Sequence, residues 1–371
     1  MSNAQHPHAL HLGRYLRVDD NPLLAHAALT QDSLLPVFAL DPSVQRSPHQ
    51  EAFLLASLAD MQSSLRALGS DLLLVHEAHP DNVRGRYNEP LRMIDDALLP
   101  FDIAAMPRTY TPFRQRVEAA GVRTSPPIDP VTSLPPLPDG VMCPTIVVPD
   151  TPMIAQGGER AARAHWQQYR DRRLPDSYKQ TRNGLLGWDY SSKLSPWLAW
   201  GCISPRRIAT DLAAYEAQYG ANDGTYWLWF ELMWRDFFAL RGEHRAHDHH
   251  AVDRAIDNAG KLWQMMATAS TGNSFVDAGL RELNATGFLG NRMRQIVASY
   301  CMYERNIPWQ VGEAYFAMTL IDYDPASNVG NWTYIAGSGA DPRGGRRFSV
   351  EKQREMYDAD GAYTRTWSAQ R

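Results

Sequence analysis

The stretch FVDAGLRELNATGFLGNRMRQIVASYCMYERNIPWQVGEAYFAMTLIDYDPASNVGNWTY, residues 275–334, decides how this sequence is interpreted. Its first half has helical spacing, because Asn291, Arg294 and Gln295 stand at positions i, i+3 and i+4 and so share one face of a helix. Its second half holds two tryptophans and, between them, a turn-forming run rich in Asp and Asn. Together these polar helical residues, indoles and turn residues indicate a binding pocket.

Three further blocks extend this pattern. They are YKQTRNGLLGWDYSSKLSPWLAWGCISPR (178–206), WLWFELMWRDFF (227–238) and RRFSVEKQREMYDADGAYTRTW (346–367). In the second block Glu231, Trp234 and Arg235 repeat the i, i+3, i+4 spacing, which places a carboxylate, an indole and a guanidinium on one helical face. The first block contains a serine-rich turn before a helix start, where hydroxyls and free backbone amides suit a pyrophosphate. A simple helix cap is the alternative for that turn.

In this order, the four blocks resemble the photolyase/cryptochrome family and, most closely, its DASH branch. Four long blocks are more specific than any short motif, and they cover most of the chain beyond about residue 165. The resemblance implies an α/β domain followed by an all-α domain that binds FAD, and chemistry driven by blue light.

Composition limits the remaining possibilities. The 371 residues predict two or three domains, and 44% hydrophobic with 21% charged residues is typical of a globular, soluble chain. No run of eighteen apolar residues and no signal-peptide pattern is found, so we expect a cytoplasmic protein without a membrane partner. Cys143, Cys202 and Cys301 are too few and too widely spaced for a disulfide framework or a metal cluster. Four His within residues 243–250 lack accompanying ligands, so no metal is expected.

Charge is distributed unevenly. The net charge is -4, with 11 Lys+Arg against 17 Asp+Glu in residues 1–150 and 26 against 24 in the rest. Two basic clusters stand out: Arg160, Arg163, Arg170, Arg172, Arg173, Lys179 and Arg182, and then Arg343, Arg346, Arg347, Lys352 and Arg354. Either cluster could form a phosphate-binding rim or a solvated helix face.

The order of elements predicts an α/β domain with a reduced, Rossmann-like parallel sheet in residues 1–123. Apolar runs at 34–40 and 71–76 predict strands, and a periodic helix is expected near 52–68. Residues 124–152 contain nine prolines and predict an extended linker, and residues 153–371 predict the all-helical FAD-binding domain. Only 27 residues separate Pro80 from the helical block at 108–118, where the family leads one to expect two more strand–helix units. We therefore expect no antenna folate at its usual site.

The resemblance assigns residues to the cofactor. It pairs Arg294 with Asp322 beside the flavin ring, where a guanidinium would favour an anionic reduced flavin. It places Asn328 at flavin N5, as a hydrogen-bond acceptor instead of an acid. The full set of implied FAD contacts is Tyr178, Ser191, Ser192, Lys193, Leu194, Ser195, Arg235, Arg294, Asp322, Asp324 and Asn328. An ordinary buried salt bridge and a plain turn asparagine are the alternatives for these assignments.

The resemblance also assigns residues to substrate and to electron transfer. The lesion is assigned to Glu231, Trp234, Asn291 and Asn328, and further DNA contacts to Arg292, Gln295, Tyr334, Arg346 and Arg347. Trp332 and Trp309 match the inner members of an electron-transfer chain, whereas Ile256 stands near the place of the outer one. Trp263 could substitute for it, although a core position is the favoured alternative for Trp263. An amphipathic core helix with a buried ion pair remains the alternative for the 227–238 face.

The resemblance thus implies a monomer that uses FAD and blue light to repair cyclobutane pyrimidine dimers, with a preference for single-stranded DNA. A DASH-like cryptochrome photosensor, which binds FAD and nucleic acid without efficient repair, is the main alternative. A light-independent helical flavoprotein is the third.

Overall fold

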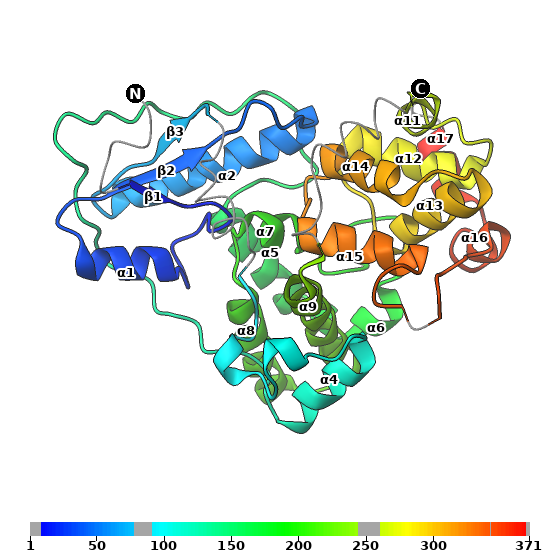
Figure 1. Cartoon of the computed structure of the whole chain (residues 1–371), viewed down its shortest axis with the longest axis horizontal. Coiled ribbons are helices and arrows are strands. Elements are labelled where there is room, and N and C mark those ends of the chain that lie inside the picture. The colour runs from blue at the N-terminus through cyan, green and yellow to red at the C-terminus, as the bar shows by residue number, and fades with distance from the viewer. Residues whose placement is uncertain (1–8, 78–90, 244–259, 342, 369–371) are drawn as a thin grey trace.

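The computed structural model describes residues 9–77, 91–243, 260–341 and 343–368, and an α/β part lies beside a larger helical part (Figure 1). The sheet has three parallel strands in the order β1 (Ala9–His11), β2 (Leu35–Ala39) and β3 (Leu73–Val75). All five residues of β2 are buried, which suits the central strand of a parallel sheet. The two predicted strands and their parallel arrangement are confirmed.

Two helices belong to this part, α1 (Pro22–Thr30) and α2 (Pro48–Ala67). Ser47 caps α2 by accepting a hydrogen bond from the Gln50 amide, and Pro48 follows in the first turn. The helix predicted near residues 52–68 is therefore present and begins earlier. The Gln50 side chain also donates to the carbonyls of Ala317 and Leu320, at 3.1 and 2.9 Å, so α2 is tied directly to the distant helical part.

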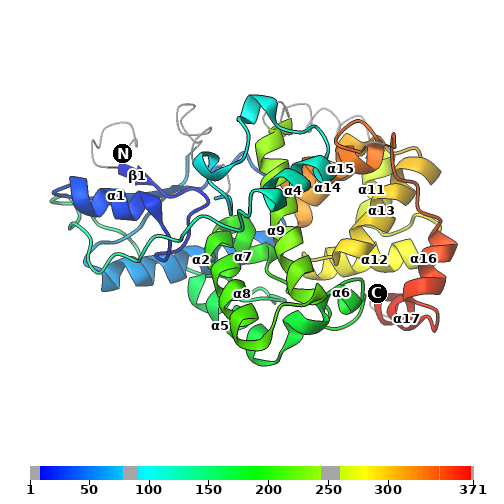
Figure 2. The ribbon, with the colours of Figure 1, turned by 90° about the horizontal axis from the view of Figure 1, so that it is seen from below.

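The segment from residue 91 to 123 contacts the helical part, whereas the sequence placed it in the α/β domain. It contains η2 (Asp96–Leu98), η3 (Ile103–Ala105) and α4 (Tyr110–Ala119). The α4 helix packs against α9 (Asp223–Arg241), and Figure 2 shows the two elements side by side. These contacts differ from those expected of a first domain that runs to residue 123.

Residues 124–152 form neither helix nor strand, as their nine prolines predict. They run along the α/β part and bind its backbone: the Leu134 amide donates to the Leu68 carbonyl at 2.8 Å, and the Leu34 amide donates to the Pro136 carbonyl at 2.9 Å.

The helical part follows, and the described residues beyond Val75 form no further strand, so the predicted all-α second part is confirmed. Its elements are α5 (Glu159–Asp171), η4 (Leu174–Ser177), α6 (Tyr178–Thr181), α7 (Ser195–Trp200), α8 (Pro205–Tyr219), α9, α11 (Gly260–Ala267), α12 (Ser274–Thr286), α13 (Asn291–Glu304), α14 (Trp309–Thr319), α15 (Pro325–Ala336), α16 (Val350–Tyr357) and α17 (Ala362–Ser368). No helix in the described ranges is both long and apolar enough to cross a bilayer.

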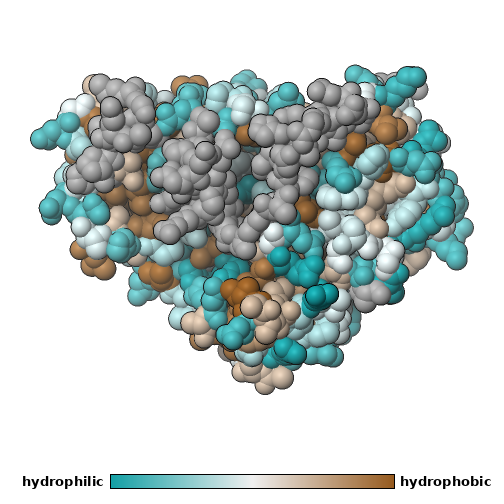
Figure 3. Space-filling view, in the orientation of Figure 1, coloured by the Kyte–Doolittle hydropathy of each residue, from teal (hydrophilic) through white to brown (hydrophobic). Residues whose placement is uncertain are grey.

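The hydrophobic core consists of two clusters. One joins the sheet, α1 and α2 to α4 and α5–α9, and the other lies within α11–α17. Polar and apolar residues are mixed over the face in Figure 3, and a hydrophobic group lies low in that view near α4. Leu98 and Ile103, which precede α4, are 42% and 45% exposed. The seam between the two clusters is where a pocket forms.

Candidate functional site

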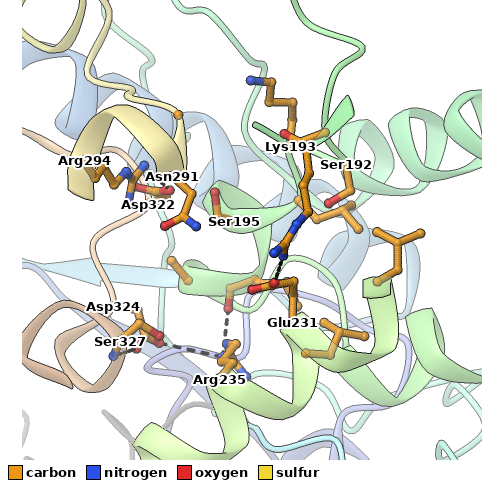
Figure 4. Close-up of a pocket in the computed structure, with 18 of the residues that line it drawn as sticks. Ser192, Lys193, Ser195, Glu231, Arg235, Asn291, Arg294, Asp322, Asp324 and Ser327 are labelled. Atoms are coloured by element: carbon orange, nitrogen blue, oxygen red, sulfur yellow. Dashed lines mark hydrogen bonds and ion pairs between the residues drawn. The ribbon is translucent and has the colours of Figure 1, made fainter. Parts of the chain in front are cut away.

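A cavity of about 260 Å³ lies at this seam. Its walls come from α6, α7 and α9 on one side and from α13 and the start of α15 on the other (Figure 4). The structure brings together the predicted residues Tyr178, Ser191, Ser192, Lys193, Leu194, Ser195, Glu231, Arg235, Asn291, Arg294, Asp322 and Asp324. A second cavity of about 80 Å³ shares part of this wall and adds Gln295, Asn328 and Trp332. The two cavities together are comparable to ligand pockets of ~300–1,000 Å³.

The serine-rich turn ends where α7 begins at Ser195, and Pro196 occupies the first helical turn. Within the turn Lys193 has a φ of +52° and is 4% exposed. Its Nζ lies 3.2 Å from the centre of the Tyr190 ring and 5.0 Å from that of Phe288, and burial lowers the pKa of Lys193 to about 7. In Figure 4 this ammonium points away from Glu231. The Lys193 ammonium therefore lies among aromatic rings, although the residue lines the cavity.

Two buried carboxylates face the cavity with unused acceptors. Asp322 accepts a hydrogen bond from Arg294 at 2.7 Å, and Asp324 caps α15 by accepting from the Ser327 amide at 2.8 Å. Asp322 Oδ1 and Asp324 Oδ2 make no hydrogen bond in the described structure, although both are buried. Burial raises the pKa of Asp324, but Arg235 and Arg14 outweigh this and lower it overall. Such acceptors call for ligand donors, because an unpaired buried oxygen is costly.

The α9 face differs in part from its prediction. Glu231 lines the cavity and forms an ion pair with Arg182, while burial raises its pKa and Arg182 opposes that rise. Arg235 donates to the carbonyls of Leu91 and Leu198, at 2.7 and 3.2 Å. These two carbonyls take two of the five N–H donors of Arg235, and the residue also lines the cavity.

Trp234 does not line either cavity. Its ring stacks on Tyr110 of α4, with centroids 3.6 Å apart and planes 10° from parallel. Tyr334 lies edge-on at 5.7 Å. The expected stacking of Trp234 on a lesion base is thus replaced, on one ring face, by Tyr110.

The α13 residues lie as their spacing predicts, on the wall opposite α9. Asn291 lines both cavities and Gln295 lines the smaller one. Arg292 donates to Gln295 Oε1 at 2.9 Å and to Asn183 Oδ1 at 3.0 Å, so its guanidinium is engaged within the protein.

Asn328 lies inside α15, not in a turn. Its Nδ2 donates to the Glu313 carbonyl at 3.1 Å and to Glu313 Oε1 at 2.8 Å. Because the amide nitrogen is turned toward α14, the amide oxygen is the atom that Asn328 can present to the smaller cavity. This orientation agrees with an acceptor role.

The three tryptophans proposed for electron transfer occupy neighbouring helices. Trp332 is 2% exposed and lies against Gly312, where a Cβ atom would collide with the indole ring. Trp309 stands one helical turn before Gly312 on α14. Trp263 of α11 packs edge-on against Tyr315 of α14, with ring centroids 5.0 Å apart. Ile256 and residues 244–250 of the histidine run lie outside the described residues.

The basic clusters are largely paired with acids. In the first cluster every member has a carboxylate within 4.0 Å; the partners are Asp60, Asp19, Glu159, Asp211, Asp189, Asp176, Asp223 and Glu231. In the second, Arg346 bonds the Tyr334 hydroxyl and Arg347 pairs with Glu304. A bare cationic rim is therefore absent from the first cluster. No group of three His, Cys, Asp or Glu in the described chain is placed to hold a metal.

Sequence reasoning missed several pocket residues. Arg182 was noted only as part of a basic cluster, and Asn183, Phe288 and Ser327 were not singled out, although all four line the cavity. Arg182 and Asn183 directly follow the Tyr178 turn, so adjacency to a predicted site residue was the available signal.

Fold and pocket together define a two-part protein whose helical half encloses a cofactor-sized pocket with unpaired acceptors. Residues 227–370 match the family model described as FAD binding domain of DNA photolyase, and residues 11–89 match DNA photolyase. The chain is 36% identical to the Cryptochrome DASH of Vibrio parahaemolyticus, over 95% of this chain and 91% of that protein.

Solved structures agree with this match. A Synechocystis cryptochrome superposes with a TM-score of 0.84 at 30% identity, covering 97% of this chain and 88% of that one. A class III photolyase from Agrobacterium tumefaciens gives 0.78 at 26% identity, over 99% and 87%. The chain belongs to the photolyase/cryptochrome family, and its helical half is that family's FAD-binding domain.

Proposed function

We propose that this protein is an FAD-dependent DNA photolyase that repairs cyclobutane pyrimidine dimers in blue light and prefers single-stranded DNA. The observation that carries the proposal is the placement of Glu231 and Asn291 on facing walls of one cavity that is also lined by two buried carboxylates, each with an oxygen that makes no hydrogen bond. The two polar groups suit the edges of a pyrimidine pair, while the carboxylates suit the cofactor.

The residues fit FAD. Asp322 Oδ1 and Asp324 Oδ2 would accept from donors of the cofactor, and the Ser191, Ser192 and Ser195 hydroxyls would hold its diphosphate. Bound FAD supplies light-driven one-electron chemistry. The protein's own part is to orient the substrate, exclude water and fix the charge of Arg294 beside Asp322.

A dimer must leave the base stack to enter the cavity. Extrusion from a duplex costs a few kcal/mol, and less when the strand is already single. This difference supports the single-strand preference. We also propose that Trp332, Trp309 and Trp263 carry electrons and that the protein acts as a monomer without a folate at the usual antenna site.

A repair assay tests the proposal. Blue light should split dimers in single-stranded oligonucleotides faster than in duplex, and darkness should leave both intact. Glu231→Ala should keep its FAD but lose most repair, since one charge-assisted hydrogen bond is worth about 1.5–3 kcal/mol. Flavin content is measured on the same samples. Equal dimer loss in parent and Glu231→Ala would remove Glu231 from the reaction.

A photosensor is the second candidate, and a specific observation favours it. Glu231 is bound by Arg182 and one face of Trp234 by Tyr110, so two groups assigned to the lesion have partners within the chain. A sensor predicts light-dependent absorbance changes with no loss of dimers. The same assay, read for both signals, separates the two functions.

A further inference from the structure

Two consecutive residues at the mouth of the cavity connect its two walls. Arg182 and Asn183 follow the short helix α6, and both line the cavity. Arg182 forms the ion pair with Glu231, and its guanidinium lies 4.2 Å from the centre of the Trp227 ring. Because Trp227 and Glu231 are one helical turn apart on α9, a single face of that helix holds Arg182 by charge and by stacking.

Asn183 makes the matching contacts to the other wall. Its Oδ1 accepts from Arg292 Nη2 at 3.0 Å and from Arg292 Nε at 3.3 Å. Arg292 in turn donates to Gln295 at 2.9 Å. Side chains from α9 and α13 are thus held by the dipeptide that directly follows α6.

The charged surroundings of Glu231 single out Arg182. The titratable groups that face Glu231 from packed elements are Tyr178 of α6, Arg182 directly after that helix, and Tyr110 of α4. On α9 itself, Arg235 is turned to backbone carbonyls and lies 3.8 Å from Asp324. Among the described residues, Arg182 is therefore the cation paired with this carboxylate.

We propose that Arg182 is a positioning residue for Glu231: with Trp227 as its support, it holds the Glu231 carboxylate in place in the cavity wall, while Asn183 holds Arg292 and Gln295 on the opposite wall. This inference rests on the proposed function, in which Glu231 contacts the substrate. An ionised carboxylate only accepts hydrogen bonds. Arg182 engages Glu231 Oε1, so Oε2 is available to a substrate N–H group.

Two opposing effects act on the carboxylate. Burial raises the pKa of Glu231, and the ion pair with Arg182 opposes that rise. Glu231 keeps a third of its side-chain surface exposed toward the cavity, and Arg182 keeps about a quarter. Removal of the guanidinium would leave the burial effect without its main opponent, and the carboxylate would take up a proton at higher pH.

Infrared pH titration of the FAD-loaded protein tests this without DNA or illumination. The protonated-carboxyl band of Glu231 is assigned by its loss in Glu231→Gln. In Arg182→Gln the midpoint of that band should move to a higher pH than in the parent, and in Arg182→Lys by less, because the charge remains while the planar stack on Trp227 is lost. The control is Arg172→Gln, which removes an exposed ion pair with Asp189 outside the cavity and should leave the midpoint unchanged.

The outcomes are distinct from those of the repair assay. A midpoint in Arg182→Gln equal to that of the parent would overturn the positioning role, whatever the repair activity. If Arg182→Gln fails to fold, Arg182→Lys is the deciding variant. Two results together would then overturn the ion pair: a midpoint in Arg182→Lys equal to that of the parent, and guanidinium infrared bands of the parent that are the same at both ends of the titration. A shifted midpoint with no repair by any variant would instead leave the positioning role standing and reject the proposed function.

Discussion

At the scale of single residues, Asn328 shows how a neighbouring side chain determines the orientation of an amide. Its amide donates twice to Glu313, which determines which atom it can turn to the cavity. Both residues are buried, at 9% and 0% exposed. An acid at this position would therefore meet a second carboxyl group where water cannot separate the charges.

Asn328→Asp should destabilise the folded protein by about 1–3 kcal/mol, because the Asn328 Nδ2 donor is lost and Glu313 loses both hydrogen bonds that it accepts from that donor. Chemical denaturation at pH 8 measures the effect. Adding Glu313→Gln restores a donor opposite the new carboxylate, so the double variant should recover part of the loss. If the loss of unfolding free energy in the double variant exceeds the sum of the losses in the two single variants, the contact between the two side chains is not what the substitution disturbs.

Lys193 gives a second prediction at this scale. Because its ammonium lies among aromatic rings instead of facing the cavity, Lys193→Met should change FAD affinity less than threefold, whereas loss of a direct charge–phosphate contact costs about 1.5–3 kcal/mol, or more than tenfold. FAD release is followed by flavin fluorescence at low and high salt. A large, salt-dependent loss of affinity would return Lys193 to the diphosphate.

These residues also show what the sequence can predict about the site. Ser191, Ser195, Asp322 and Asp324 lie in turns and helix starts, where local sequence determines the backbone, and all line the cavity as expected. The Lys193 ammonium lies against Tyr190, three residues before it, and Phe288, which is distant in the chain, so a local pattern could predict only part of its surroundings.

At the scale of elements, α9 shows that three residues predicted on one helical face contact different surroundings. Residues at i+3 and i+4 lie about 100° apart around a helix, one on each side of residue i. Glu231 therefore faces the cavity, while Trp234 turns to α4 and Arg235 to backbone carbonyls. Shared spacing predicts proximity on a helix, and the packed neighbours decide what each side chain contacts.

The next residue of α9, Asp236, connects the helix to the segment before α4. It is 2% exposed and accepts from the amides of Met93 and Ile94, at 2.9 and 2.8 Å. Burial raises the pKa of Asp236 to about 6 from 3.8, despite the opposing amides. The folded state thus binds this proton more tightly than the unfolded state, and the stability that protonation contributes is complete below about pH 3.8 and lost as pH rises through 6.

The difference in unfolding free energy between parent and Asp236→Asn should therefore fall by roughly 2 kcal/mol between pH 4.5 and 7.5, at about 1.4 kcal/mol per pKa unit. Above pH 7 the variant should still be less stable than the parent, since the asparagine oxygen accepts from one amide but its NH2 group opposes the other. Urea unfolding at several pH values measures both proteins, and other titrating groups cancel in the difference. A difference that does not vary with pH would show that Asp236 keeps an ordinary pKa.

At the scale of the whole molecule, the core crosses the boundary that the sequence suggests. Residues 124–152 read as a linker, yet the first hydrophobic cluster joins Phe53 of α2 to Trp197 of α7, with ring centroids 6.3 Å apart. A buried ion pair between Asp20 and Arg206, 0% and 5% exposed, adds a polar connection. Proline content predicted the extended segment correctly, but contacts between residues so far apart in sequence have no local signature.

We therefore predict that the α/β part and the helical part unfold in a single cooperative transition, although a linker division at residues 124–152 would allow two. The chain offers a separate probe for each part. All 11 tryptophans lie at or beyond Trp166, so indole fluorescence reports the helical part. Cys143 is the one cysteine that is not buried, and Arg66 of α2 donates to its carbonyl, so a thiol-linked dye there reports the α/β part.

Unfolding in guanidinium, followed by both signals on the same sample, should give equal midpoints and slopes. Asp20→Asn should shift both curves together, because it removes the buried counter-charge of Arg206 and leaves only the half-exposed Asp95, at a cost of up to about 3–5 kcal/mol. A dye transition that precedes the tryptophan transition, in the parent or in the variant, would show that the α/β part opens on its own.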